Sequence, residues 1–169
     1  MFIKNKGYPL CIQPYATVFV YDGVCQITDL IYHVSPHETH NPDENVTVCC
    51  TVENQQNADK KLSVFRTLPI KHKCITAQPL IERVNLEPYL DGVELVVVGG
   101  ESDKDARPLD YNWVLDIREQ CIRKRVNFEF RQCGTHFIKD GRQYKLQTKD
   151  LCRQARLAGI NYKYTNELL

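Results

Sequence analysis

The chain has 169 residues, a length typical of one domain, and its 43% hydrophobic and 25% charged residues match an ordinary globular protein. Its 22 Lys and Arg residues nearly balance 21 Asp and Glu residues, whereas a dedicated nucleic-acid or membrane-surface protein carries a large basic excess. No run approaches the roughly 18 apolar residues of a membrane span, and residues 1–7 lack the apolar core of a signal peptide. These features predict a single cytoplasmic domain over residues 1–169.

Most of the chain alternates between short β-branched runs and stretches whose apolar residues recur at helical spacing. Strands are expected at residues 16–21, 45–52, 73–77, 93–98 and 126–131. Helices are expected over residues 25–34, after an N-cap at Asn54, and after an N-cap at Asp110. The helix after Asp110 carries one apolar stripe, made of Trp113, Val114, Ile117, Cys121 and Ile122.

The tail has a different pattern. Asp140-Gly141 lies between two short runs in residues 137–144, which is the signature of a tight β-hairpin. A last helix is expected to begin at an N-cap on Thr148 and to stop at Gly159.

Strands that alternate with helices at this spacing predict an α/β fold with a parallel sheet of about five strands. A complete eight-unit barrel typically needs about 250 residues, so the chain is expected to form an open sheet or a partial (β/α) barrel, followed by the hairpin and helix.

One face of the expected strands is apolar and the other is small and polar. In residues 45–52, for example, Val48 and Cys50 alternate with Thr47 and Cys49. A parallel strand packed on both faces is apolar throughout, so the polar face indicates either the lining of a ligand-sized concavity or a face open to solvent.

Polar residues follow the carboxyl ends of the expected strands, where α/β folds bind ligands. Carboxylates there can accept from amino or hydroxyl groups, arginines can pair with a carboxylate or phosphate, and a Gly-Gly pair lets a ligand approach the backbone. The alternatives are an internal ion-pair network and an ordinary turn. The candidate ligand-binding residues are Glu53, Asn54, Gln78, Gly99, Gly100, Glu101, Ser102, Arg107, Arg131 and Gln132.

Eight cysteines occur without a single Cys-x-x-Cys pair, so structural zinc and thioredoxin-type sites are not expected. The cysteines are expected to be reduced, half-buried thiols. His33, His37 and His40 lie in a polar stretch that is expected to be a solvated loop rather than a metal site. His136 is close in sequence to Cys133, but this spacing does not establish a catalytic dyad. Basic residues near Arg123 are expected to be a solvated helix face, so a nucleic-acid partner is not expected.

Several stretches resemble a phage-type, largely uncharacterised family with a radical S-adenosylmethionine-like barrel. The most specific runs from residue 96 to residue 110, with Gly99-Gly100-Glu101-Ser102 and Ala106-Arg107-Pro108. The other matching stretches are residues 50–55, 78–80, 113–121 and 130–134. The resemblance covers about residues 45–160, and residues 1–44 match poorly. It implies that the five strands correspond to the fourth to eighth strands of the family's barrel.

The departures from this family bear on its chemistry. Full-length members carry a Cys-x-x-x-Cys-x-x-Cys motif for a [4Fe–4S] cluster, and no cysteines here have that spacing. The family's usual Glu before Pro-Leu is Gln78. We therefore expect a truncated, cluster-less member of unknown cellular role, without radical catalysis and with no cofactor.

Two alternatives remain. One is a domain that binds S-adenosylmethionine or a related nucleoside, and the other is one half of a split enzyme completed by a separate amino-terminal half-barrel. Because an open parallel sheet exposes unpaired edges, we also expect a homo-oligomer, most simply a dimer.

Overall fold

A five-stranded parallel sheet forms the centre of the molecule. The computed structural model describes residues 16–20 and 46–165, so the expected helix over residues 25–34 and the His33, His37 and His40 stretch lie outside the described residues. The strands are β1 (Ala16–Val20), β2 (Val46–Thr51), β3 (His72–Ala77), β4 (Val93–Gly99) and β6 (Asn127–Gln132). All five strands expected from the β-branched runs are therefore confirmed.

The strands lie side by side in the order β1-β2-β3-β4-β6, and every neighbouring pair is parallel. Each new strand is added beside the previous one, so the described order contains no point at which the winding reverses. The α/β class with a parallel sheet is confirmed, and the five described strands do not close into a barrel.

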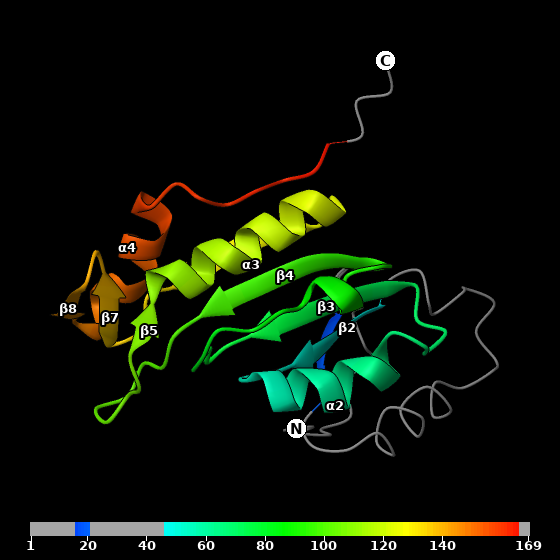
Figure 1. The fold of residues 1–169 in the computed structure, drawn as a ribbon, viewed down its shortest axis with the longest axis horizontal. Coiled ribbons are helices and arrows are strands. Elements are labelled where there is room, and N and C mark those ends of the chain that lie inside the picture. Colours follow the sequence, from blue (N-terminus) through cyan, green and yellow to red (C-terminus); the bar gives the residue numbers. More distant parts are fainter. Residues whose placement is uncertain (1–15, 21–45, 166–169) are drawn as a thin grey trace, which may run out of the picture.

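Two helices cover the same face of this sheet (Figure 1). They are α2 (Gln55–Phe65) and α3 (Tyr111–Lys124), and their N-caps are Asn54 and Asp110, as expected. Each capping side chain accepts a hydrogen bond from a backbone N–H of the first turn and so satisfies a donor without an intrahelical partner. The helices and the alternate strand residues form one apolar core, which includes Ala58, Leu62, Phe65, Val114, Ile117, Val96, Val98 and Phe128.

Gln120 is a buried polar residue on the apolar stripe of α3, which the sequence pattern did not indicate. Its Oε1 accepts from the backbone N–H groups of Leu86 and Glu87 at 2.6 and 3.0 Å, and its Nε2 donates to the carbonyl of Val84 at 3.1 Å. The side chain thus ties the connection around η2 (Glu87–Tyr89) to α3.

A small second sheet lies at one end of the main sheet and consists of β5 (Leu109–Asp110), β7 (His136–Lys139) and β8 (Arg142–Lys145). The expected hairpin is confirmed, because β7 and β8 pair antiparallel around Asp140 and Gly141, whose φ angles are 52° and 71°. Two consecutive positive φ angles are what a two-residue hairpin turn of type I′ requires.

The expected N-cap at Thr148 is wrong. Thr148–Asp150 forms a short 3-10 turn, η3, and the helix α4 spans only Leu151–Leu157, with no side-chain cap at its start. The turn closes through the backbone, where Asp150 N–H donates to the carbonyl of Gln147 at 2.8 Å. The helix does stop before Gly159, whose φ is 63°.

After α4 the chain runs back beside the main sheet (Figure 1) and pairs with β6. Phe128 N–H donates to the Tyr162 carbonyl at 2.8 Å, and Tyr162 N–H donates to the Phe128 carbonyl at 3.0 Å. Asn161 Oδ1 accepts from Phe130 N–H at 2.8 Å. The β6 edge of the sheet is therefore partly covered by the chain itself.

On the second face of the sheet, the side chains at the centre are small and closely packed. Cys49, Cys74 and Val97 come from three adjacent strands and are 4%, 3% and 2% exposed. Thr76 is also buried. The polar strand face was expected either to line a ligand-sized concavity or to be open to solvent. This part of it is not open to solvent.

Candidate functional site

The structure brings most of the candidate residues together at the carboxyl edge of the main sheet. Glu53 follows β2, Gln78 follows β3, Gly99 ends β4 and Gln132 ends β6. Backbone hydrogen bonds join the segments beyond the strands: Ile81 N–H donates to the carbonyl of Glu53 at 3.1 Å, and Leu80 N–H donates to that of Gly99 at 2.9 Å. The edge is therefore a connected surface rather than a set of separate loops.

Gly99 and Gly100 are required by close packing within the chain. A Cβ on Gly100 would lie 2.8 Å from the carbonyl oxygen of Cys133 and 2.9 Å from Cα of Gly134. Gln132 strengthens the contact, since its Nε2 donates to the carbonyl of Gly100 at 2.7 Å. The close approach that the Gly-Gly pair indicated is thus made here by the chain's own backbone and side chains.

Gln78 has an unusual environment. A Cβ on Gly99 would lie 2.9 Å from both Cδ and Oε1 of Gln78, so the Gln78 amide group packs directly on the Gly99 backbone. Its Oε1 is buried and has no hydrogen-bond partner. Since an unpaired buried acceptor is destabilising by about 1–3 kcal/mol, this atom is the clearest sign of an unmet interaction at the edge.

Glu101 and Arg107 form an ion pair. Arg107 Nε donates to both carboxylate oxygens of Glu101 at 3.0 and 3.1 Å, its Nη2 also contacts Oε1, and its backbone N–H donates to Oε2 at 2.6 Å. These hydrogen bonds from Arg107 hold the pKa of the Glu101 carboxyl below its ordinary value. The structure therefore favours the internal ion pair over an Arg107 free to bind an anion.

Glu53 and Asn54 are partly engaged by α2. Asn57 Nδ2 donates to Glu53 Oε2 at 2.7 Å, and Lys61 Nζ lies 3.7 Å from Glu53 Oε1. Asn54 Oδ1 caps the helix by accepting from Asn57 N–H at 2.8 Å. Glu53 keeps about a quarter of its side chain exposed, so it can still accept from a ligand.

Two candidates do not join the group. Ser102 is exposed in the turn that follows Glu101. Arg131 is 44% exposed and lies on the second face of β6, where its Nε donates to Glu129 Oε1 at 3.3 Å. The edge thus offers acceptors, from Glu53 and Gln78, more than free cations.

A comparison with protein families identifies the kind of chain this is. A family model described as a protein of unknown function, DUF5131, matches residues 23–163, which is well over half of the chain. The chain belongs to this family. Searches of curated proteins and of solved structures found no match. The DUF5131 match includes every candidate residue at the sheet edge.

The six described cysteines of this DUF5131 chain are all reduced, as expected, and five of them are buried. Burial raises the pKa of the Cys50 thiol to about 11 and that of Cys133 to about 12. A hydrogen bond from Cys74 lowers the pKa of Cys49, and the same hydrogen bond raises that of Cys74. A buried Cys133 with a raised pKa is a poor nucleophile, and the nearby His136 Nδ1 contacts Gln143 instead.

Within residues 16–20 and 46–165, no group of three or more His, Cys, Asp or Glu side chains could hold a metal ion. None of the described helices is both long enough and apolar enough to cross a membrane.

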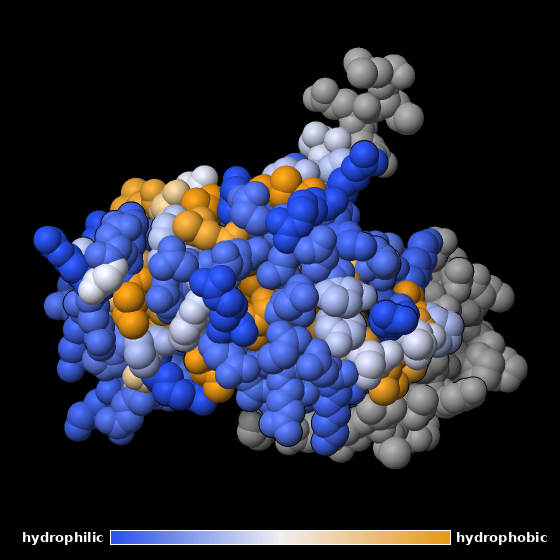
Figure 2. All heavy atoms as spheres, in the orientation of Figure 1, coloured by the Kyte–Doolittle hydropathy of each residue, from blue (hydrophilic) through white to orange (hydrophobic). Residues whose placement is uncertain are grey.

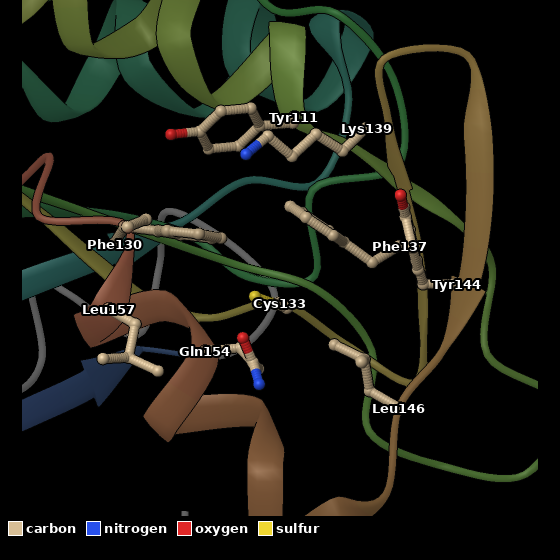
Figure 3. A pocket seen from close by; sticks show the side chains of 10 residues that line it. Tyr111, Phe130, Cys133, Phe137, Lys139, Tyr144, Leu146, Gln154 and Leu157 are labelled. Atoms are coloured by element: carbon tan, nitrogen blue, oxygen red, sulfur yellow. The ribbon is translucent and has the colours of Figure 1, made fainter.

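Sequence reasoning missed a cavity of about 420 Å³ between α3, β6, the small sheet and α4 (Figure 3). Its lining residues are Tyr111, Phe130, Cys133, Phe137, Lys139, Tyr144, Leu146, Gln154, Leu157 and Ala158. They come from elements that only the three-dimensional fold brings together. The one signal in the sequence was the number of aromatic residues near the hairpin.

Proposed function

We propose that this protein is a non-radical binding domain for a small, polar ligand of the nucleoside class, and that the ligand occupies the carboxyl edge of the parallel sheet. The observation that carries the proposal is the buried Oε1 of Gln78, which has no hydrogen-bond partner. A ligand that donates a hydrogen bond to this atom would remove the free-energy penalty of an unsatisfied acceptor.

The remaining groups at the edge support a ligand rich in donors. Glu53 is partly exposed and accepts hydrogen bonds, whereas the Arg107 guanidinium is already paired with Glu101. An anionic ligand would have to displace that pair. Ribose hydroxyls, an exocyclic amino group and the ammonium group of S-adenosylmethionine are all donors, and S-adenosylmethionine is the ligand that the family resemblance implies.

The proposed scaffold is a partial (β/α) barrel. Sequential parallel strands with helices on one face are the arrangement of consecutive barrel units, and barrel enzymes bind their substrates at the carboxyl edge. The cysteines of this chain have no Cys-x-x-x-Cys-x-x-Cys spacing, so the proposal assigns them no iron–sulfur cluster.

The test is a pair of Gln→Met substitutions. In Gln78→Met the side chain keeps nearly the same length but loses the unpaired acceptor, so we expect equal or greater stability to urea. We expect calorimetry to show affinity for S-adenosylmethionine or adenosine weakened about tenfold, because the ligand's donor is then left unpaired. Gln147→Met is the matched control, since Gln147 is exposed and makes no capping hydrogen bond.

Two results would overturn the proposal. One is that the unaltered protein binds none of S-adenosylmethionine, S-adenosylhomocysteine and adenosine. The other is that Gln78→Met binds them as tightly as Gln147→Met does. A large loss of stability in Gln78→Met alone would assign Gln78 a structural role instead.

A further inference from the structure

The cavity beside the small sheet has the features of a second binding site, separate from the sheet edge. Its volume of about 420 Å³ lies within the range of roughly 300–1,000 Å³ that is usual for small-molecule sites. In the part of the chain that the structure describes, two large hydrophobic side chains are exposed, Tyr144 at 44% and Leu157 at 69%, and both line this cavity. Figure 2 shows hydrophobic residues gathered at the end of the molecule that carries α4.

The walls of the cavity are aromatic. The rings of Tyr111 and Phe137 are 5.7 Å apart in an edge-to-face arrangement, and Phe130 lies 6.2 Å from Phe137 and 6.3 Å from Tyr111. Tyr144, which is partly exposed, stands beside Phe137 (Figure 3). Aromatic walls of this kind favour a flat ring, because ring faces and edges attract one another beyond the burial of apolar area.

The polar groups of the cavity are few and differ in kind. Lys139 lies beside Tyr111, with its Nζ 5.3 Å from the ring centroid, and no carboxylate among the described residues forms an ion pair with it. Gln154 comes from α4, on the opposite side of the cavity (Figure 3). An ammonium group without a counter-ion at the edge of an aromatic cavity attracts an anionic substituent on the bound ring.

The surrounding chain adds to this charge preference. Residues 135–157 contain six Lys and Arg residues against two Asp residues, a net charge of +4, although the whole chain has a net charge of only +1. The segment that supplies most of the cavity's lining therefore carries a net positive charge, which favours anions near it.

We propose that this cavity binds a flat aromatic ring that carries an anionic group, with the ring against the wall formed by Tyr111, Phe137 and Tyr144 and the anion at Lys139. Such a ligand could come from two sources, a small aromatic acid or a nucleoside monophosphate, which share this chemistry. The proposal does not depend on the ligand at the sheet edge, because the two sites use different side chains.

The test compares matched pairs of ligands by calorimetry. Indole-3-carboxylate against indole represents the small aromatic acids, and adenosine monophosphate against adenosine represents the nucleotides. We expect the anionic member of one pair to bind about fivefold more tightly than the neutral member, as one partly exposed charge pair provides. The pair that shows the preference identifies the source, and the ¹⁵N–¹H signal of the Gln154 side chain should shift when that ligand binds.

Two substitutions that each remove one positive charge test where the anion binds. Lys139→Gln should abolish the preference for the anionic member, whereas Lys149→Gln should keep it, since Lys149 is exposed and does not line the cavity. Leu157→Gln should weaken the binding of both members of the pair. Gln78→Met should leave the affinities for indole-3-carboxylate and indole unchanged. The nucleotide pair is compared in the Gln78→Met protein, whose sheet edge is expected to bind adenosine weakly, so failure at one site can be told from failure at the other.

Three outcomes would overturn the inference. The first is that neither anionic ligand binds, and the second is that both anionic ligands bind no better than their neutral partners. The third is that Lys139→Gln and Lys149→Gln reduce the preference equally, because the effect would then come from overall charge rather than from the cavity.

Discussion

At the scale of single residues, the ion pair between Glu101 and Arg107 shapes the loop after β4. The backbone and guanidinium hydrogen bonds of Arg107 all converge on one carboxylate. The backbone of Glu101 also contacts the loop around Gly134, because Thr135 N–H donates to the Glu101 carbonyl at 2.7 Å. Glu101 therefore joins the end of β4 to Arg107 through its side chain and to the segment that leads into β7 through its backbone carbonyl.

This pair predicts a defined pH dependence of stability. The pKa of Glu101 is lower in the folded protein than its ordinary value of 4.5, so its contribution is complete above that value and is lost as pH falls through the folded pKa. Glu101→Gln should therefore have a lower urea midpoint than the unaltered protein at pH 7, and the difference should shrink steadily below about pH 4.5.

Arg107→Gln provides the control for this measurement. In Arg107→Gln the urea midpoint should fall less on going to low pH than it does in the unaltered protein, because hydrogen bonds from Arg107 are the main cause of the lowered pKa of Glu101. If urea midpoints of Glu101→Gln and the unaltered protein differ by the same amount at pH 3 and pH 7, the ion pair does not contribute as described.

At the scale of elements, the strands and long helices were predictable because their signals are local. Alternating residues such as Val48 and Cys50 defined the buried face of β2, and the polar side chains of Asn54 and Asp110 marked the helix starts. The two-residue strand β5 was not predictable, since it pairs with β7 across more than twenty residues and has no local pattern. Thr148 failed as a cap for a related reason: a backbone turn satisfies the donors there.

Asn54 has two possible roles, as the cap of α2 and as a ligand-binding residue, and two substitutions separate them. Asn54→Ala removes the acceptor for Asn57 N–H and should reduce the free energy of unfolding by about 1 kcal/mol. Asn54→Ser keeps a capping oxygen but loses the amide donor, so its stability should stay close to that of the unaltered protein.

Urea denaturation measures the capping role through the stability of each variant. Calorimetry with S-adenosylmethionine or adenosine measures the ligand-binding role. We expect Asn54→Ser to bind ligand as the unaltered protein does, because the Asn54 side chain is already used by the helix. Weaker binding by a stable Asn54→Ser would show instead that the amide group contacts the ligand.

At the scale of the whole molecule, the sequence indicated a parallel sheet and the edge where its polar residues meet, but not how that edge is occupied. The side chains of Glu101 and Arg107 were candidate ligand-binding groups, with an internal ion pair as the alternative, and in the structure they neutralise each other. The aromatic cavity was missed because Tyr111, Phe137 and Leu157 are far apart in the chain. The cavity depends on contacts between distant segments, and the ion pair depends on the conformation of a loop whose two partners are six residues apart. Strand and helix periodicity encodes neither.

The dimer stays a prediction. The fold limits which edge of the sheet a second copy would pair with. Residues 161–164 cover part of the β6 edge, so that edge has less need of a second copy. Among the described strands, β1 is at the other end of the sheet. A dimer, or a separately encoded half-barrel, would therefore be expected at β1 rather than at β6.

The cover on β6 can be tested with two proline substitutions. Tyr162→Pro removes the N–H that donates to the Phe128 carbonyl, so we expect a loss of about 1 kcal/mol or more and an exposed strand edge. Lys163→Pro is the matched control, because the hydrogen bonds of this segment to β6 come from Asn161, Tyr162 and Tyr164. Light scattering over a range of protein concentrations should show association beyond that of the unaltered protein for Tyr162→Pro alone. If the two variants scatter alike and unfold at the same urea concentration, the returning segment does not protect the β6 edge.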